Sequence, residues 1–488
     1  MGALDLLTDA LVGWVRPGCD TKSLAMAFTR EVPLQMFRGT SYQVCGLWPY
    51  VIGGATPEVG VPLGQVLQGS GMLCADHISW FRKGLISAPS GMVLGLNGLG
   101  KSSLIRRIIL GLAYQGVHSM ILGDIKPDYV DLVQALGGQV ITVGHGRAGI
   151  NPLDAGNVDE ALALLAGRPQ EQQALARSAH QRKKTLMISL IHIVRRRPPT
   201  EREEVVLDQA ISLLEHRSGK PGLADLLAVI RQAPDELRRA AIDRGDIRRY
   251  RALVEDLEVS LEALACGRLG EIFSAPSTTA MMMDRSTVFD VSSLLQEDLD
   301  VGAAVLLACW SYGFATIEIA QTLADAGVAP RRHYNLVMDE LWRILEASSG
   351  MVSRVNALTR LNRTIGVGQL MCTHSMADMN ALASLEDRTK ARGFVERSKM
   401  LFLGGLPSQE IDLLSGVMHF SCAEQKLLSS WNAPGTYNPY TDQVTGHCGV
   451  GKFLLKTSDA PGVAFQVRFA PGERALNDTS ARWREEMG

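Results

Sequence analysis

The sequence lacks any cysteine pattern that would build a disulfide framework or a zinc site. Its eight cysteines are scattered over 488 residues, and none forms a C-x-x-C pair. Several lie in apolar runs, such as Cys309 at the end of Val305–Cys309 and Cys372 after Leu370-Met371. This pattern is typical of reduced, buried thiols in a cytoplasmic protein.

An excess of charge of one sign is also lacking. Lysine and arginine number 49 against 51 aspartates and glutamates, which gives a formal net charge of −2. The sequence therefore excludes the global basic field that many nucleic-acid-binding proteins carry. Any contact with nucleic acid would have to be local.

Neither a signal peptide nor an apolar run of about 18 residues stands out, so the sequence predicts no integral membrane span. Near the N-terminus, Leu4, Leu7, Leu11 and Trp14 would share one helical face. Such a face packs inside a protein or docks on a membrane or a partner, and both readings stay open. We expect a cytoplasmic protein and leave peripheral attachment to the inner membrane open.

What the sequence does contain is an alternation of strand and helix patterns. Residues 86–156 alternate in this way, with a buried strand expected at Met120–Asp124. The alternation returns in residues 276–488, with a long apolar helix from about Val301 to Leu323 and a hairpin-like tail. Repeated strand–helix–strand units indicate an α/β fold with a mainly parallel sheet.

Two other regions differ in pattern. Residues 157–275 read as helix throughout, which predicts an all-helical insertion, and residues 1–85 suggest an N-terminal helix with a small β-rich module. The helical block carries three basic clusters, which are either solvated helix faces or a contact surface for a partner or polyanion. The clusters are Arg182–Lys184, Arg195–Arg197 and Arg248–Arg251.

The most informative stretch matches the phosphate-binding loop pattern G-x-x-x-x-G-K-[ST] at every fixed position, between a strand pattern and a helix pattern. Glycines let backbone N–H groups converge on phosphates, and the helix start adds free N–H groups. Lys101 should reach the β- and γ-phosphates, and Ser102 should bind Mg²⁺. The expected nucleotide-binding residues are Gly95, Leu96, Asn97, Gly98, Leu99, Gly100, Lys101, Ser102 and Ser103.

A second part of a nucleotide site is indicated by Asn335–Glu340, an apolar strand that ends in two acids. This is a Walker B pattern. Asp339 should hold Mg²⁺, and Glu340 should orient or activate the attacking water. Hydrolysis needs a carboxylate of this kind, so we expect a nucleoside triphosphatase rather than a small-molecule kinase.

Two further features are candidates for catalysis. The expected strand Gly366–Thr373 is followed by His374, which either contacts the γ-phosphate or caps the strand as an ordinary polar residue. A preceding helix pattern places Arg360 and Arg363 on one face. These arginines are candidates for an arginine finger in a neighbouring subunit's site, with surface salt bridges as the alternative.

The order of these motifs resembles the VirB/TraC-type ATPases of conjugation and type IV secretion, within the HerA/FtsK-like group of P-loop motors. The likeness runs from about residue 60 to the C-terminus. The segments that carry it are Gly95–Ser102, Asp124–Tyr129, Leu136–Gly138, Gly149–Asp154, Phe289–Ser292, Val337–Trp342 and Thr373–Ser375.

The resemblance implies a RecA-like motor domain with an all-helical insertion, ATP and Mg²⁺ as cofactors, and hexamers on the cytoplasmic side of a secretion channel. ATP rather than GTP is inferred from the family. Two departures stand out: only about 85 residues precede the loop domain, and Thr373-His374 replaces the family's usual Thr-Gln. Because histidine changes charge near neutral pH, we expect a stronger pH dependence of turnover than in relatives with glutamine.

Three functions are weighed on this basis. The leading one is an oligomeric ATP-hydrolysing motor that energises a type IV secretion or conjugative transfer apparatus, with its components as partners. The alternative is a HerA/FtsK-like or coupling-protein DNA translocase, which needs basic residues along a ring's pore. The third is a nucleotide-binding scaffold that turns over slowly, against which Glu340 argues.

Overall fold

The computed structural model describes residues 57–68, 71–216, 219–274, 279–294, 299–340, 366–380, 384–438, 443–445, 447–457 and 461–476. All of them belong to one unit, Gly54–Gly488. The helix expected at the N-terminus and the arginines Arg360 and Arg363 lie outside the described residues.

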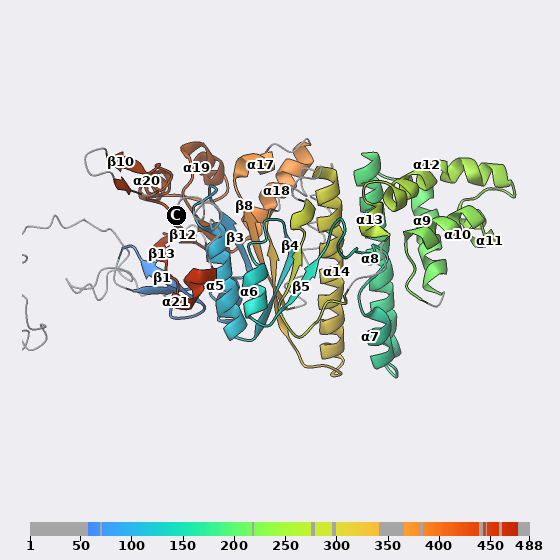
Figure 1. Cartoon of the computed structure of the whole chain (residues 1–488), viewed down its shortest axis with the longest axis horizontal. Coiled ribbons are helices and arrows are strands. Elements are labelled where there is room, and N and C mark those ends of the chain that lie inside the picture. The colour runs from blue at the N-terminus through green and yellow to red at the C-terminus, as the bar shows by residue number, and fades with distance from the viewer. Residues whose placement is uncertain are drawn as a thin grey trace, which may run out of the picture. The chain divides into compact units, whose positions relative to one another are not determined.

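A large mixed sheet of eleven strands forms the centre of the described part (Figure 1). The strands from β9 to β5 are parallel to one another, and the other four join one edge in antiparallel orientation. The predicted α/β class with a mainly parallel sheet is confirmed. In spatial order the strands are β2 (Met72–Cys74), β1 (Pro62–Val66), β13 (Val463–Val467), β12 (Lys452–Lys456), β9 (Met400–Leu403), β3 (Ser90–Leu94), β8 (Val367–Thr373), β7 (His333–Met338), β4 (Val117–Asp124), β6 (Thr287–Asp290) and β5 (Gln139–Thr142).

Both faces of the sheet are covered by helices, which explains why its central strands are continuous apolar runs. Successive side chains alternate between two cores: Val93 of β3 belongs to one, and Met92 and Leu94 belong to the other. The helices on the Val93 side are α4 (His77–Arg82), α5 (Lys101–Tyr114) and α6 (Val130–Ala135). Those on the other side are α14 (Leu299–Asp325), α17 (Met376–Asn380), α18 (Leu385–Arg397), α19 (Ser408–Ser415) and α20 (Cys422–Ser430).

Helix α14 is the long apolar helix expected from about Val301 to Leu323. Its most apolar 18-residue window has a mean hydropathy of 1.5, so by length and composition this helix could cross a membrane. However, 94% of that window is buried inside the protein. The helix packs against β4 on one side and α8 (Pro169–Arg195) on the other, and burial all round accounts for its composition.

The chain between β5 and β6 is helical wherever the structure describes secondary structure beyond residue 157 (Figure 1, green). Local signals set its helix ends: Pro169 opens α8, and a capping box of Thr200 and Glu203 opens α9. Besides α8, the helices are α7 (Val158–Leu164), α9 (Glu201–Glu215), α10 (Leu223–Gln232), α11 (Asp235–Ala240), α12 (Ile247–Cys266) and α13 (Gly270–Phe273).

The first and last described strands meet at one edge of the sheet. β1 pairs with β13, and β13 forms an antiparallel hairpin with β12. Arg107 of α5 also forms an ion pair of 2.6 Å with Glu473 of α21 (Pro471–Leu476). The remaining short elements are the 3-10 helix η1 (Ser292–Leu294) and a ribbon of β10 (Thr436–Asn438) and β11 (Gln443–Thr445).

Candidate nucleotide-binding site

Glycine shapes the loop between β3 and α5. Gly98 and Gly100 have φ angles of 79° and 94°, a region that residues with a Cβ rarely adopt. Gly100 is also the N-cap of α5, and it has no side chain to bond the first turn. The first N–H groups of α5 can therefore donate to a ligand at the positive end of the helix dipole.

Lys101 begins α5 and is only 7% exposed. Its Nζ donates to the carbonyl oxygens of Gly95 at 2.7 Å and Leu96 at 3.2 Å, and Asn97 Oδ1 lies at 3.4 Å. Burial lowers the pKa of Lys101, and the negative charge of Asp339 is among the effects that oppose this shift. The ammonium group is thus held within the loop.

The order of the strands brings the loop and the two acids together. β8 lies between β3 and β7, and all three strands are parallel, so their carboxyl ends share one edge of the sheet. A cleft of about 610 Å³ at this edge is lined by Lys101, Ser102, Asp339, Glu340 and His374, among others. Residues remote in sequence therefore face the same cleft.

Asp339 is oriented by two buried donors. The hydroxyl of Tyr129 donates to Asp339 Oδ2 at 2.8 Å, and the thiol of Cys372 also hydrogen bonds to this carboxylate. Burial, and then the charge of Asp339, raise the pKa of Tyr129 and of Cys372 well above their usual values. Both groups therefore stay protonated and act as neutral donors.

Further acids come from the end of β4 and the loop after it. The Ser102 hydroxyl hydrogen bonds to Asp128, and Asp124 accepts bonds from the N–H groups of Asp128 at 3.0 Å and Tyr129 at 2.8 Å. Burial raises the pKa of Asp128, and it raises the pKa of Asp124 to about 7 although those N–H groups oppose it. Acidic groups thus crowd beside Ser102.

Glu340 is held in an unusual position. It has a φ of 50°, rare for a residue other than glycine, and is only 7% exposed. Lys126 Nζ lies 2.9 Å from its Oε1, and His374 Nε2 lies 3.0 Å from its Oε2. Burial alone would raise the pKa of Glu340, but the bonds from His374 and Lys126 hold it well below its usual range.

The tip of β8 carries polar atoms that lack partners. Thr373 Oγ1 and His374 Nδ1 are buried without a hydrogen-bond partner in the described part of the chain. His374 also lines the cleft. Its ring therefore has one nitrogen directed at Glu340 and one with unused hydrogen-bonding capacity.

Segments from the C-terminal part of the chain support the loop. Leu96 N–H donates to the Gly405 carbonyl at 3.3 Å, and Gly451 N–H donates to the Leu99 carbonyl at 2.9 Å. Val450 and Phe469 from the C-terminal part of the chain line the cleft, as does Ser103. The loop residues Leu96 and Leu99 therefore anchor the loop through their backbone.

Several residues of the cleft carry no role in the sequence argument. Lys126, Asp124 and Asp128 lie in a segment that we used only for the family resemblance. A signal was present, because these charges directly follow an apolar strand, and parallel strands place their carboxyl ends at the ligand edge. Val450 and Phe469 gave no such signal. Arg360 and Arg363 lie outside the described residues.

Oxygen donors dominate the part of the cleft where a metal is expected. Ser102 contributes a hydroxyl and Asp339 a carboxylate, both of which suit Mg²⁺. Within the described ranges, no group of three or more His, Cys, Asp or Glu side chains could hold a metal ion.

No protein-family model and no curated protein sequence matches this chain. Among solved structures, VirB4 of Thermoanaerobacter pseudethanolicus superposes with a TM-score of 0.61 at 19% identity, covering 86% of this chain and 100% of that one. The fold of this chain is similar to that of VirB4. The likeness confirms the fold that the motifs implied.

Two structures of conjugative coupling proteins match less well. Unbound TrwBdeltaN70 gives a TM-score of 0.49 at 12% identity over 85% of this chain and 91% of that one. TrwB in complex with ADP and Mg²⁺ gives 0.48 at 13% identity over 86% and 97%.

Proposed function

We propose that this chain is a Mg²⁺-dependent ATPase whose active site is the cleft at the carboxyl ends of β3, β8 and β7. The observation that carries the proposal is the meeting of Lys101 and Ser102 with Asp339 and Glu340 in one cleft. A glycine loop at a helix N-terminus suits a phosphate chain, and a buried, ionised carboxylate suits a water nucleophile.

Each residue has a proposed role. Lys101 and the loop N–H groups bind the phosphates, and Ser102 and Asp339 hold Mg²⁺, which neutralises charge on the phosphates when bound. Glu340 orients the attacking water and accepts its proton. His374 positions Glu340 through the contact of 3.0 Å. Arg360 and Arg363 are proposed to act on a neighbouring subunit's site.

We further propose that the ATPase works as an oligomeric motor, hexameric in its active form, in a type IV secretion or conjugative transfer apparatus at the inner face of the membrane. The VirB4-like fold supports this proposal. Residues 86–156 and 276–488 would form the motor domain, 157–275 the insertion that transmits the nucleotide state, and 1–85 an N-terminal segment whose strands β1 and β2 join the sheet of the motor domain.

The DNA-translocase alternative depends on basic surface in the insertion. Most residues of the three basic clusters are neutralised by acids. The ion pairs are Arg182–Glu318, Lys183–Glu215, Lys184–Asp208, Arg195–Glu203, Arg196–Asp300 and Arg197–Asp256. Arg248, Arg249 and Arg251 are exposed and take part in none of the ion pairs among the described residues. Within the three described clusters, these arginines are the basic side chains that remain for a DNA contact.

The deciding experiment measures nucleotide binding and turnover of the purified chain and of Glu340→Gln. We expect the parental protein to hydrolyse ATP, and the variant to bind ATP but lose at least about 100-fold in turnover. Parental turnover in the variant would remove Glu340 from its role, and no nucleotide binding by either protein would overturn the proposal. Stimulation by DNA that falls steeply with salt would favour the translocase.

A further inference from the structure

Two lysines, not one, face the cleft. Lys101 belongs to the phosphate loop, whereas Lys126 follows β4 and lines the same cleft. The charge of Lys126 acts on Lys101, since it contributes to lowering the pKa of Lys101. Both lysines also line the same cleft of about 610 Å³, so one polyanion bound there can contact both ammonium groups.

Lys126 is the more exposed partner in its ion pair with Glu340. The Nζ–Oε1 distance is 2.9 Å, but the Lys126 side chain is 48% exposed and the Glu340 side chain only 8%. Glu340 is also fixed by its backbone and by His374. A flexible lysine stem can turn to a new anion, whereas the buried carboxylate cannot follow it.

The pairing in the structure also limits what Glu340 can do. A carboxylate that accepts bonds from a lysine and a histidine is stabilised as the anion and has fewer lone pairs for a water molecule. Release of Lys126 would vacate one bonding position on Oε1 of Glu340, an oxygen that also lies 3.2 Å from His374 Nε2. A ligand that attracts Lys126 would therefore also make Glu340 accessible.

We propose that Lys126 is a second phosphate-binding lysine, which leaves Glu340 for the terminal phosphate when a nucleoside triphosphate binds. The inference rests on the proposed function and adds a residue that senses the third phosphate. With a diphosphate bound, Lys126 stays on Glu340. The exchange couples the accessibility of the water-orienting carboxylate to the presence of the bond to be cleaved.

Binding of a non-hydrolysable ATP analogue and of ADP, each with Mg²⁺, tests the proposal by calorimetry. Lys126→Met should lower the affinity for the analogue at least about tenfold, because a charge-assisted hydrogen bond is lost, and should leave the affinity for ADP within about twofold of the parental value. Lys126→Arg should keep most of the preference for the triphosphate. Lys183→Met is the matched control, because Lys183 forms a similar pair of 2.8 Å with Glu215 far along the insertion.

Equal weakening of both nucleotides, or no change in either, would overturn the inference while leaving the proposed function intact. Failure of the parental protein to bind either nucleotide would instead overturn the proposed function. If Lys126→Met does not fold, Glu340→Gln gives the second test. That variant frees Lys126 from its partner and should bind the triphosphate more tightly with ADP unchanged, so an unchanged or lower triphosphate affinity would contradict the exchange.

Discussion

Acidic side chains have opposite pKa shifts in the cleft at the edge of the sheet and in the helical insertion. In the cleft, acidic side chains outnumber basic ones, and burial raises the pKa of Asp124 and Asp128. In the insertion, acids lie opposite bases on neighbouring helices, and bonds from these bases outweigh burial and lower the pKa of Glu203 and Asp208. Acids of the insertion and of α14 pair with most of the insertion's basic clusters, whereas the cleft gains from a bound cation.

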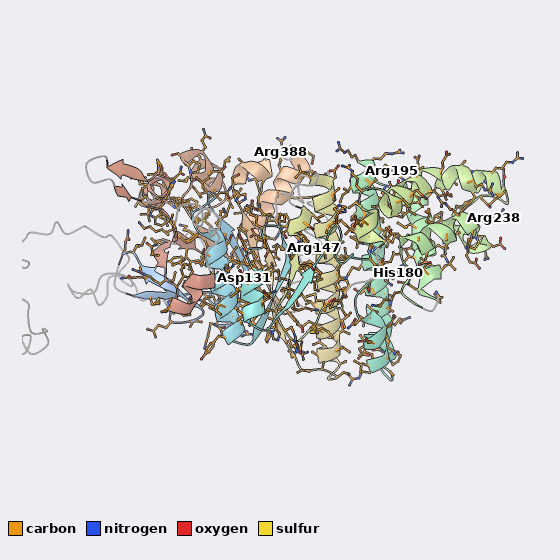
Figure 2. All side chains as sticks on the ribbon, in the orientation of Figure 1. Asp131, Arg147, His180, Arg195, Arg238 and Arg388 are labelled. Carbon is orange, nitrogen blue, oxygen red and sulfur yellow. The ribbon has the colours of Figure 1, made fainter. Side chains whose placement is uncertain are left out.

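Arg195 shows how the insertion achieves this balance. Its guanidinium binds Glu203 through two bonds of 3.0 and 2.8 Å and reaches Ser260 Oγ of α12 at 3.0 Å. Figure 2 labels Arg195 together with His180, which also lies on α8 and contacts Asp208 at 3.2 Å and Glu215 at 2.8 Å. In a chain of nearly neutral composition, charged side chains thus stabilise helices in the insertion and line a candidate binding site in the cleft.

The largest expected difference between the regions concerns nucleotide binding. Lys101→Met should weaken ATP binding by about 1,000-fold, because a buried cation directed at the phosphates is lost. Lys183→Met in the insertion should leave affinity unchanged. Titration of both variants with a non-hydrolysable analogue measures this, and a weakening of less than about tenfold in Lys101→Met would contradict the assignment of the loop.

The second expected effect is a pH dependence that originates in the cleft. The pKa of Asp124 is raised from 3.8 to about 7, so between these values the folded protein binds a proton that the unfolded chain has released. The free energy of unfolding should therefore fall by up to about 4 kcal/mol as the pH rises through that window. Asp124→Asn should flatten the curve.

Denaturant titrations from pH 4 to pH 8 without nucleotide or Mg²⁺ compare these two proteins. A parental curve as flat as that of the variant would mean that the N–H groups of Asp128 and Tyr129 keep Asp124 ionised.

The third expected effect belongs to the insertion. Glu203→Gln should lower the free energy of unfolding by about 3 kcal/mol, because the largely buried Arg195 loses its counter-charge. Asp256→Asn is the control, since its pair with Arg197 is exposed and should contribute less than about 1 kcal/mol. Thermal and chemical unfolding measure both, and nucleotide affinity should be unchanged. Equal destabilisation by the two substitutions would contradict the importance of burial.

The pKa of Glu203 is lowered, so this contribution is present above the ordinary glutamate range and is lost in acid. The two regions should therefore respond to pH with opposite sign.

The smallest expected effect concerns the tip of β8. His374→Gln should lower turnover by about a few-fold, because the contact of 3.0 Å between the His374 ring and Glu340 is lost, while stability stays within about 1 kcal/mol. Steady-state turnover from pH 5.5 to 9 measures it. Superimposable curves for the two proteins would exclude His374 from the control of Glu340.

The sequence predicted local structure closely where the hydrophobic periodicity was clear and where proline or glycine ended the elements. Residues 157–275, which read as helix, contain helices α7 to α13, and the apolar strand expected before the two acids is β7, His333–Met338. Prolines and capping residues act on neighbours within a few positions, so helix ends can be predicted from a single sequence. The sequence also predicted the long apolar helix α14, but not that it is buried on all sides, because this burial depends on partners from distant segments.

The candidate site was predictable in its parts but not in its contacts. The spacing of the phosphate loop and the acids after an apolar strand identified Lys101, Ser102, Asp339 and Glu340. Lys126 is evident in the sequence just after β4, but its neighbouring residues do not indicate which carboxylate it contacts.

The sequence by itself determined the helices, the strands, the glycine-dependent loop and the chemical types of the groups at the ends of the strands, because each rests on interactions between close neighbours in the chain. Only the tertiary structure decided that β8 lies between β3 and β7, that β1 closes on β13, and that Glu340 meets Lys126 and His374. Strand neighbours are chosen by hydrogen bonds and packing between distant segments, and such choices leave no periodic trace in the segments themselves.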